Sequence, residues 1–319
     1  MSYQWKAAAL RKLKFFLKGL ASLKANFYKK GIISLRIKKK NAYDSEEFKQ
    51  GIKAIGITSG DSIFVMCSVD KIYYKTGKRI PVHIMLNDII EYLGPSGTLM
   101  VLSFSENREA ILRHKIRFDI RKTPTESGIF SELLRRKQAA VRSLQPIWSA
   151  TAYGKKAEGY CNSHHMSPYP YDENSPYYKI MQDGGKYLGI GVGFEAFTPC
   201  HMIDDTYKNT FRHRMYFEQP CTFEVVDETG SLKKMQFYVR NPATCPHEYD
   251  PRYYFKLLNI PTRHIQLSFG MQLFSFIISD FYSAAIDLYD KKRITIWATG
   301  RMLFQSYSFL KSFLRLLLK

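Results

Sequence analysis

Acidic residues are missing from both ends of this 319-residue chain, although the whole chain contains 28 of them. Residues 1–40 hold twelve Lys or Arg residues, residues 301–319 hold four, and neither segment holds an Asp or a Glu. The net charge of +20 is therefore concentrated at the ends, and the body between them carries about +4, an ordinary value for a globular domain. No zinc-finger, RNP or helix-turn-helix pattern accompanies the basic residues, so we expect no nucleic-acid partner.

Cysteine is scarce, and no two cysteines have the CxxC spacing. The five cysteines are odd in number, which is more typical of reduced thiols in the cytosol than of a disulfide framework. A secretory signal is not indicated, because lysines interrupt the first apolar positions. The most apolar internal run, residues 271–279, is too short to cross a bilayer. We therefore expect a cytoplasmic protein. The cysteines are Cys67, Cys161, Cys200, Cys221 and Cys245.

Internal repeats and linkers rich in Pro, Gly or Ser are also absent, which favours one domain over two. Hydrophobic residues make up 45% of the chain and aromatic residues 15%, too many for a disordered protein. We predict a basic arm over residues 1–43, a globular body over residues 44–300 and a basic tail over residues 301–319.

Both ends carry apolar residues at helical spacing with basic residues between them. Amphipathic helices of this kind bind anionic membranes, so our first hypothesis is peripheral attachment to the inner membrane. The alternatives are packing of these helices on the body and contact between subunits of a homo-oligomer. The apolar positions are Leu10, Leu13, Leu17, Leu20 and Phe27 in the arm and Leu303, Tyr307, Leu310, Phe313, Leu314 and Leu317 in the tail.

The body alternates apolar strands with helices, the pattern of a layered α/β/α domain whose site lies at the strand ends. Past residue 215 the pattern becomes a hairpin, which we predict to make an antiparallel addition near residues 221–240 to a mixed central sheet. Strands are predicted over residues 62–67, 97–105, 149–154 and 186–193, and helices over residues 45–56, 82–93, 128–136 and 177–182.

Four polar clusters stand in loops that follow predicted strands. A histidine near a carboxylate is the arrangement of a general base, and turn hydroxyls with an arginine suit a phosphate or an oxyanion. A metal site is less favoured, because H-x-x-D spacing is common and no HExxH or Cys-rich cluster supports it. A dinucleotide loop at residues 189–193 is weaker still, because the full GxGxxG spacing is missing. The clusters are Cys67 with Ser68, residues 123–128 with residues 142–146, His164 with His165, and His201 with Asp204 and Asp205.

Taken in order, seven blocks between residues 44 and 296 resemble the aminoglycoside 3-N-acetyltransferase family. They are "GDSIFVMCSV", "LGPSGTLMVLSFS", "TPTESGIFSELLRR", "AVRSLQPIWSATAYGKKAE", "HMSPYPYDENSP", "GGKYLGIGVG" and "TPCHMIDD". The resemblance implies a single α/β domain that binds acetyl-CoA, or another acyl-CoA, and transfers the acyl group to a sugar amine by direct attack.

The resemblance also implies roles for individual residues. His165 is the general base toward the acceptor amine, Asp204 orients it or binds the acceptor, and His201 belongs to the same network. The residues implied to contact the coenzyme are Ser68, Thr123, Ser127, Arg142 and Ser143.

Two residues depart from the family pattern and bear on the acceptor. Asp204 stands where the family usually has Glu, and Gln145 stands where it often has His or Asn. The body is also mildly basic, which favours a negatively charged acceptor over a polycationic drug. Our first hypothesis is therefore an N-acyltransferase for an amino sugar, or nucleotide sugar, of a bacterial surface polysaccharide or glycolipid. The alternatives are aminoglycoside 3-N-acetylation, as in antibiotic resistance, and a repurposed relative that transfers a sugar or only binds a glycan.

Overall fold

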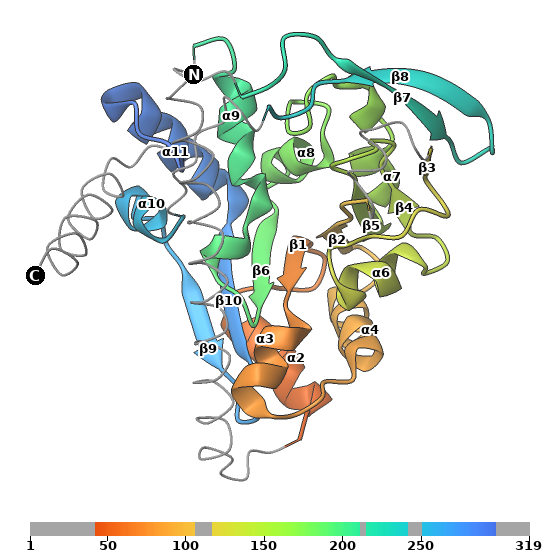
Figure 1. Cartoon of the computed structure of the whole chain (residues 1–319). Coiled ribbons are helices and arrows are strands. Elements are labelled where there is room, and N and C mark those ends of the chain that lie inside the picture. Colours follow the sequence, from red (N-terminus) through yellow and green to blue (C-terminus); the bar gives the residue numbers. More distant parts are fainter. Residues whose placement is uncertain (1–41, 106–116, 211–214, 242–250, 298–319) are drawn as a thin grey trace, which may run out of the picture.

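The computed structural model describes residues 42–105, 117–210, 215–241 and 251–297 (Figure 1). Within these ranges a seven-stranded mixed sheet carries helices on both faces, and a three-stranded sheet lies to one side. The predicted layered α/β fold with a mixed central sheet is therefore confirmed. The amphipathic helices predicted within residues 1–40 and 301–319 lie outside the described residues.

The strand order in the central sheet is β4-β5-β2-β1-β6-β10-β9. Their bounds are Val141–Arg142 for β4, Ala150–Gly154 for β5, Thr98–Leu102 for β2, Ser62–Cys67 for β1, Lys186–Ile190 for β6, Gln272–Ile277 for β10 and Arg263–Gln266 for β9. The α-helices are α2 Ser45–Ala54, α3 Val69–Thr76, α4 Val82–Leu93, α6 Ile129–Arg135, α7 Ala157–Cys161, α8 Pro176–Gln182, α9 Met202–Thr206, α10 Pro251–Leu258 and α11 Ile278–Lys292.

The three central strands are parallel, and their sequences are nearly continuous apolar runs. β1 pairs with β2 from Ser62 opposite Thr98, and with β6 from Ile63 opposite Lys186. Parallel strands are buried on both faces, which explains why these runs do not alternate with polar residues. All three strands end at the same edge of the sheet, so the loops that follow them lie close together. β5 and β10 pair antiparallel with β2 and β6 and flank this centre.

Successive residues of the central strands enter two different cores, one on each face of the sheet. Ile63 and Val65 pack with the cluster that includes residues of α2, α4 and α6. Phe64, between them, packs with the cluster that includes residues of α7, α8 and α11. The sheet is thus covered on both faces, and the site must lie at its ends rather than on a face.

The predicted hairpin is present, but its place differs from the prediction. β7 (Cys221–Val226) pairs antiparallel with β8 (Leu232–Phe237), and β7 also pairs in parallel with the short β3 (Phe118–Asp119). These strands form a sheet of their own, not an addition to the central sheet. The reason is that the inward face of the hairpin buries a separate apolar core. That core includes Phe118, Ile120, Leu144, Ile147, Phe223, Val225, Phe237 and Val239.

Local signals explain some helix ends. The first helix is capped by Asp44, whose carboxylate accepts a hydrogen bond from the Glu47 N–H at 2.8 Å, so Ser45 is its first residue. α4 has the predicted bounds and ends at Gly94, where φ is +67°. Within the described ranges, no helix combines the length and apolar character needed to cross a bilayer.

Candidate functional site

Loops after β1 and β6 meet at the carboxyl edge of the sheet. Ser68 follows β1 directly, and its hydroxyl caps α3 by accepting a hydrogen bond from the Lys71 N–H at 3.3 Å. The Lys71 ammonium contacts the Glu195 carboxylate at 3.3 Å, which joins α3 to the loop after β6. Ser68 therefore lies at the carboxyl edge of the sheet, and its hydroxyl serves a helix cap. Its contact with coenzyme stays a prediction.

The turn of residues 123–128 is bonded to the loop after β2. Ser127 Oγ accepts a hydrogen bond from the Phe104 N–H at 3.0 Å, and Thr125 Oγ1 donates to the Phe104 carbonyl at 2.7 Å. Thr123 Oγ1 accepts from the Asp119 N–H at 2.8 Å. The structure thus brings the predicted Ser127 to the end of β2 and the predicted Thr123 to the end of β3, because side chains of the turn satisfy the exposed backbone there.

Arg142 is buried between the turn of residues 123–128 and the loop after β2. Its guanidinium donates to the Thr123 carbonyl at 2.5 Å, to the Ser103 carbonyl at 2.9 Å and to Ser149 Oγ at 3.0 Å. Burial lowers the pKa of Arg142 to about 9, so the side chain remains protonated at neutral pH. The side chain therefore ties the turn to the loop after β2. Its predicted contact with coenzyme stays a prediction.

Ser143 and His164 form a buried latch between β4 and the loop after α7. His164 Nδ1 lies 2.8 Å from Ser143 Oγ, and His164 Nε2 lies 3.0 Å from the Pro170 carbonyl. Because a carbonyl only accepts, Nε2 carries the proton, and Nδ1 accepts from the Ser143 hydroxyl. Burial lowers the pKa of His164 to about 3, so the ring stays neutral. The latch fixes the start of the 3-10 turn His164–Met166 and exposes the next residue, His165.

Replacing His164 by alanine should destabilise the fold by about 3 kcal/mol, because the Ser143 hydroxyl and the Pro170 carbonyl lose their partner and a cavity opens. Urea unfolding followed by circular dichroism measures the change. His165→Ala, in the same turn but exposed, is the matched control and should alter stability by less than about 0.5 kcal/mol. Equal losses in both variants would show that the latch is not what holds this loop.

Asp204 is buried and receives three hydrogen bonds on one oxygen. His201 Nδ1 lies 2.9 Å from Asp204 Oδ2, the Arg240 guanidinium lies 2.8 Å from it, and the Trp297 indole N–H lies 2.9 Å from it. In the part of the chain that the structure describes, Asp204 forms these bonds and makes none with His165. The predicted orientation of His165 by Asp204 is therefore not what the structure shows: Asp204 pairs with His201, three residues earlier on the same short helical segment, because the spacing of three places both side chains on one face.

The electrostatics of this group keep Asp204 ionised and His201 neutral. Burial alone raises the pKa of Asp204, but the Arg240 charge and the hydrogen bonds from His201 and Trp297 outweigh it and lower that pKa. Burial and the Arg240 charge lower the pKa of His201 against the opposing effect of Asp204. The His201 ring is only 12% exposed and stacks on Trp297 at a centroid distance of 5.3 Å. Because the neutral His201 ring carries one proton and donates it from Nδ1 to Asp204, His201 Nε2 is unprotonated.

Asp205, the next residue, anchors a different segment. It accepts a hydrogen bond from the Tyr216 hydroxyl and another from the Tyr171 N–H at 2.7 Å. Burial raises the pKa of Asp205 to about 7, although these hydrogen bonds and the Arg240 charge act in the opposite direction. Tyr216 and Arg240 also face each other in an isolated β-bridge. Asp205 thus holds the segment before β7 against α9 through Tyr216, and Asp204 holds the segment after β8 through Arg240.

The raised pKa of Asp205 predicts a pH dependence of stability. The folded protein holds this proton up to about pH 7, whereas the unfolded chain releases it near the ordinary value of 3.8. The Asp205 contribution is therefore most favourable below pH 4 and is lost as pH rises toward 7. The free energy of unfolding of the wild type minus that of Asp205→Asn should fall between pH 4 and 7. Asp70→Asn, on the exposed side of α3, is the control, and a flat difference for Asp205→Asn would refute the assignment.

Gln145 is fully buried and caps its own turn. Its side-chain oxygen accepts hydrogen bonds from the N–H groups of Ile147 at 2.7 Å and Trp148 at 2.6 Å. Gln145, the residue that departs from the family pattern, therefore fixes the backbone of Trp148 through this hydrogen bond.

Aromatic rings connect the strand-end loops with the Asp204 group. Phe104 contacts Trp148 at a centroid distance of 4.7 Å, Trp148 contacts Tyr171 at 5.9 Å, and Tyr171 contacts His201 at 5.6 Å. The loop after β2 and the His201–Asp204 group thus border one continuous region. Sequence reasoning missed Arg240, Trp297, Trp148 and Tyr171, because no spacing connects positions so far apart in the chain.

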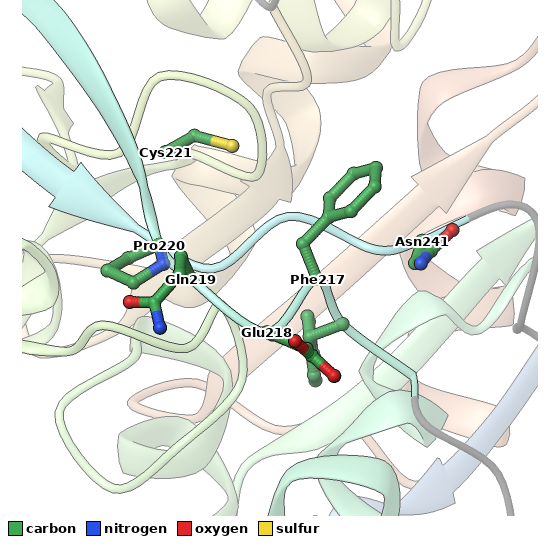
Figure 2. Close-up of a pocket in the computed structure, with 7 residues that line it drawn as sticks. Phe217, Glu218, Gln219, Pro220, Cys221 and Asn241 are labelled. Atoms are coloured by element: carbon green, nitrogen blue, oxygen red, sulfur yellow. The ribbon is translucent and has the colours of Figure 1, made fainter.

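A surface pocket of about 570 Å³ lies at the base of the hairpin (Figure 2). Asn241, the residue after Arg240, lines one side, and Phe217 and Glu218 line the other. A volume of this size accommodates a small molecule of sugar dimensions. Across the described ranges, no three His, Cys, Asp or Glu side chains are grouped as metal ligands.

Comparison with known proteins identifies the family. A family model described as aminoglycoside 3-N-acetyltransferase matches residues 64–250, more than half of the chain. The chain belongs to this family. Among curated members, the aminoglycoside N(3)-acetyltransferases VIII of Streptomyces fradiae and VII of Streptomyces paromomycinus are 25% and 26% identical over 186 and 187 residues. The matches span 54% and 53% of this chain but only 64% and 62% of those relatives, less than two thirds of either.

Several solved structures share the fold. AAC-IIIb in its binary complex with CoASH has a TM-score of 0.64 at 18% identity, covering 79% of this chain and 98% of its own. AAC-VIa bound to sisomicin has a TM-score of 0.63 at 19% identity, with coverages of 79% and 99%. The YokD protein of Bacillus subtilis has a TM-score of 0.60 at 17% identity, with coverages of 77% and 98%.

Proposed function

We propose that this protein is an acetyl-CoA-dependent N-acetyltransferase that modifies an amine of an amino-sugar acceptor. The observation that carries the proposal is the continuity between the strand-end loops and the histidine–carboxylate group of His201 and Asp204, in a chain of this family. One relative of the same fold is described with CoASH and another with sisomicin, which supports a coenzyme and an aminoglycoside as the two substrates.

The residues at the strand ends fit a coenzyme with phosphate groups. Hydroxyl side chains of the turn at residues 123–128 border the end of β2, and Gly128 leaves open space beside its Cα. The buried Arg142 adds a positive charge behind this turn. Acetyl-CoA supplies an acetyl group activated as a thioester. The five residues implied by the resemblance remain the proposed contacts with it: Ser68, Thr123, Ser127, Arg142 and Ser143.

Amide formation requires an unprotonated amine, because an ammonium has no lone pair for attack. We assign the general base to His165, which is exposed and can pass the proton to water, while the neighbouring His164 fixes its backbone. The amine nitrogen then bonds to the acetyl carbon as the carbon–sulfur bond breaks. The nitrogen gives up its second proton to the departing thiolate, so that the coenzyme leaves as a free thiol. His201 and Asp204 form the wall that holds the acceptor.

The comparisons favour an aminoglycoside-type acceptor over the surface glycan of our first hypothesis. Both curated relatives are named for acetylation of aminoglycosides, and one solved structure of the same fold is described as bound to sisomicin. Their names also support group transfer over glycan binding alone. The membrane-binding role proposed for the two ends is independent of this acceptor assignment.

The direct test is to incubate the purified protein with acetyl-CoA and a panel of amino sugars and aminoglycosides. Free thiol release and a mass gain of one acetyl group on the acceptor should appear together. Omission of the acceptor controls for thioester hydrolysis. Thiol release with no acetylated product for any amine would overturn the transferase assignment, and so would the absence of both signals when the protein is folded.

A further inference from the structure

We propose that the exposed face of α3, together with the link that follows this helix, binds the surface of an anionic lipid bilayer. We call this surface the α3 patch. It lies on the globular body and is independent of the acetyl transfer proposed for the site. The patch consists of Tyr73, Tyr74, Lys75, Lys78 and Arg79.

Two neighbouring tyrosines of α3 are exposed to solvent. Ile72 and Thr76, one turn apart, are buried and form the inward face of the helix, so Tyr73 and Tyr74 lie outside that face. Tyr73 is 47% exposed and Tyr74 is 56% exposed, and their rings contact each other edge to face at a centroid distance of 6.1 Å. A tyrosine ring combines an apolar body with a polar hydroxyl, which suits the headgroup level of a bilayer.

The α3 patch carries a net positive charge. Residues 71–87 contain four Lys or Arg residues and no Asp or Glu, the same bias as at the two ends of the chain. Of these basic residues, Lys75 and Arg79 belong to the exposed class. Two acids lie on or beside α3: Asp70 in its first turn, and Glu195, which forms an ion pair with the helix at 3.3 Å. Four basic residues outnumber these two acids, so the surface attracts anions.

The α3 patch also lies near the place where the basic arm joins the body. The Lys75 ammonium donates a hydrogen bond to the Gln272 side-chain oxygen at 2.6 Å, at the start of β10. Tyr43, the last residue of the predicted arm, contacts the ring of Phe269 at a centroid distance of 5.4 Å. Both contacts are made with the short segment of residues 269–272, so the arm leaves the body beside α3 (Figure 1).

Charge decides which partner fits this surface. The arm itself holds twelve basic residues and no acid, so it would meet like charges if it folded back onto Lys75 and Arg79. A second copy that docked patch to patch would meet the same repulsion. An anionic bilayer complements the patch and the arm together. The apolar positions at helical spacing in both ends also favour a lipid phase over a nucleic acid, because only lipid buries them.

Flotation of the full chain with vesicles tests the proposal. The wild type should float with vesicles of phosphatidylglycerol and phosphatidylcholine in equal parts but not with phosphatidylcholine alone, and high salt should weaken the binding. Tyr74→Ser with Arg79→Glu should weaken it about 10-fold or more, because an interfacial ring is lost and a charge is reversed. Leu232→Ser with Lys234→Glu makes matched changes at exposed positions of β8, far from α3, and should bind like the wild type (Figure 1).

Lysine labelling shows which surface the vesicles cover, and it needs no variant. A succinimidyl ester is added to the wild type with and without anionic vesicles, and mass spectrometry measures the label on each lysine. Labelling of Lys75 should fall about 5-fold or more when the protein is bound, because the ammonium then lies against headgroups. Labelling of Lys234 on β8 should not change. If Tyr74→Ser with Arg79→Glu does not fold, this comparison decides.

Several results would overturn the proposal. They are a wild type that stays in solution with anionic vesicles, equal flotation with both vesicle types, and unchanged binding by folded Tyr74→Ser with Arg79→Glu. Full labelling of Lys75 in floated protein would also overturn it, because the ends alone would then hold the bilayer. Acetyl-CoA without vesicles is the last control. If the coenzyme protects Lys75 as well as vesicles do, the patch belongs to the coenzyme phosphates and not to lipid.

Discussion

Replacing His165 by alanine is expected to lower kcat for acetylation about 100-fold or more, because the acceptor ammonium then loses its proton only to water. KM for acetyl-CoA should change little, since the neighbouring His164 still holds the turn through Ser143 and Pro170. The measurement is thiol release at saturating substrates over a range of pH. Raising the pH should recover part of the lost rate, because more of the acceptor amine is then unprotonated.

His201→Ala is the matched comparison, because it removes the other histidine of the site. The expected result is a raised KM for the acceptor with a smaller loss in kcat, since the His201 ring packs between Trp297 and Tyr171 and bonds to Asp204. If His201→Ala loses kcat 100-fold and His165→Ala does not, then the base is His201, oriented by Asp204, and our assignment is wrong.

Replacing Arg142 by methionine is expected to destabilise the fold by about 3 kcal/mol. The buried carbonyls of Ser103 and Thr123 lose their donor, at about 1–3 kcal/mol for each unsatisfied group, and the relief of burying a charge offsets part of this. Because the same bonds join the turn at residues 123–128 to the end of β2, KM for acetyl-CoA should rise. Urea unfolding and initial rates with varied acetyl-CoA measure the two effects.

Arg121→Met controls for the loss of one arginine near the same turn, because its side chain is exposed. It should leave both stability and KM for acetyl-CoA close to their wild-type values. A stable Arg142→Met protein with unchanged KM would show that this guanidinium neither supports the turn nor contributes to coenzyme binding.

Local signals in the sequence were sufficient for much of the central domain. The apolar run ending at Cys67 predicted β1 with its observed bounds, and the periodic segment closed by Gly94 predicted α4 equally well. Polar residues directly after apolar strands predicted the loops of the site. The reason is that the carboxyl ends of parallel strands lie at the same edge of the sheet.

Local signals failed where one element runs into the next or where partners are distant. β10 ends at Ile277 and α11 begins at Ile278, with no glycine or proline to mark the change, so neither element was predicted. The hairpin was predicted, but its membership of a separate sheet depends on an apolar core shared with Leu144 and Ile147, which lie far away in the sequence.

The sequence by itself determined the fold class, the family and the set of polar residues at the strand ends, because these depend on local patterns and on the order of motifs. Only the tertiary structure decided how those residues pair. Asp204 bonds to Arg240 and Trp297, 36 and 93 residues away, and His164 rather than His165 is buried against Ser143. Such pairings follow from the packing of whole elements, which brings together side chains that no sequence spacing connects.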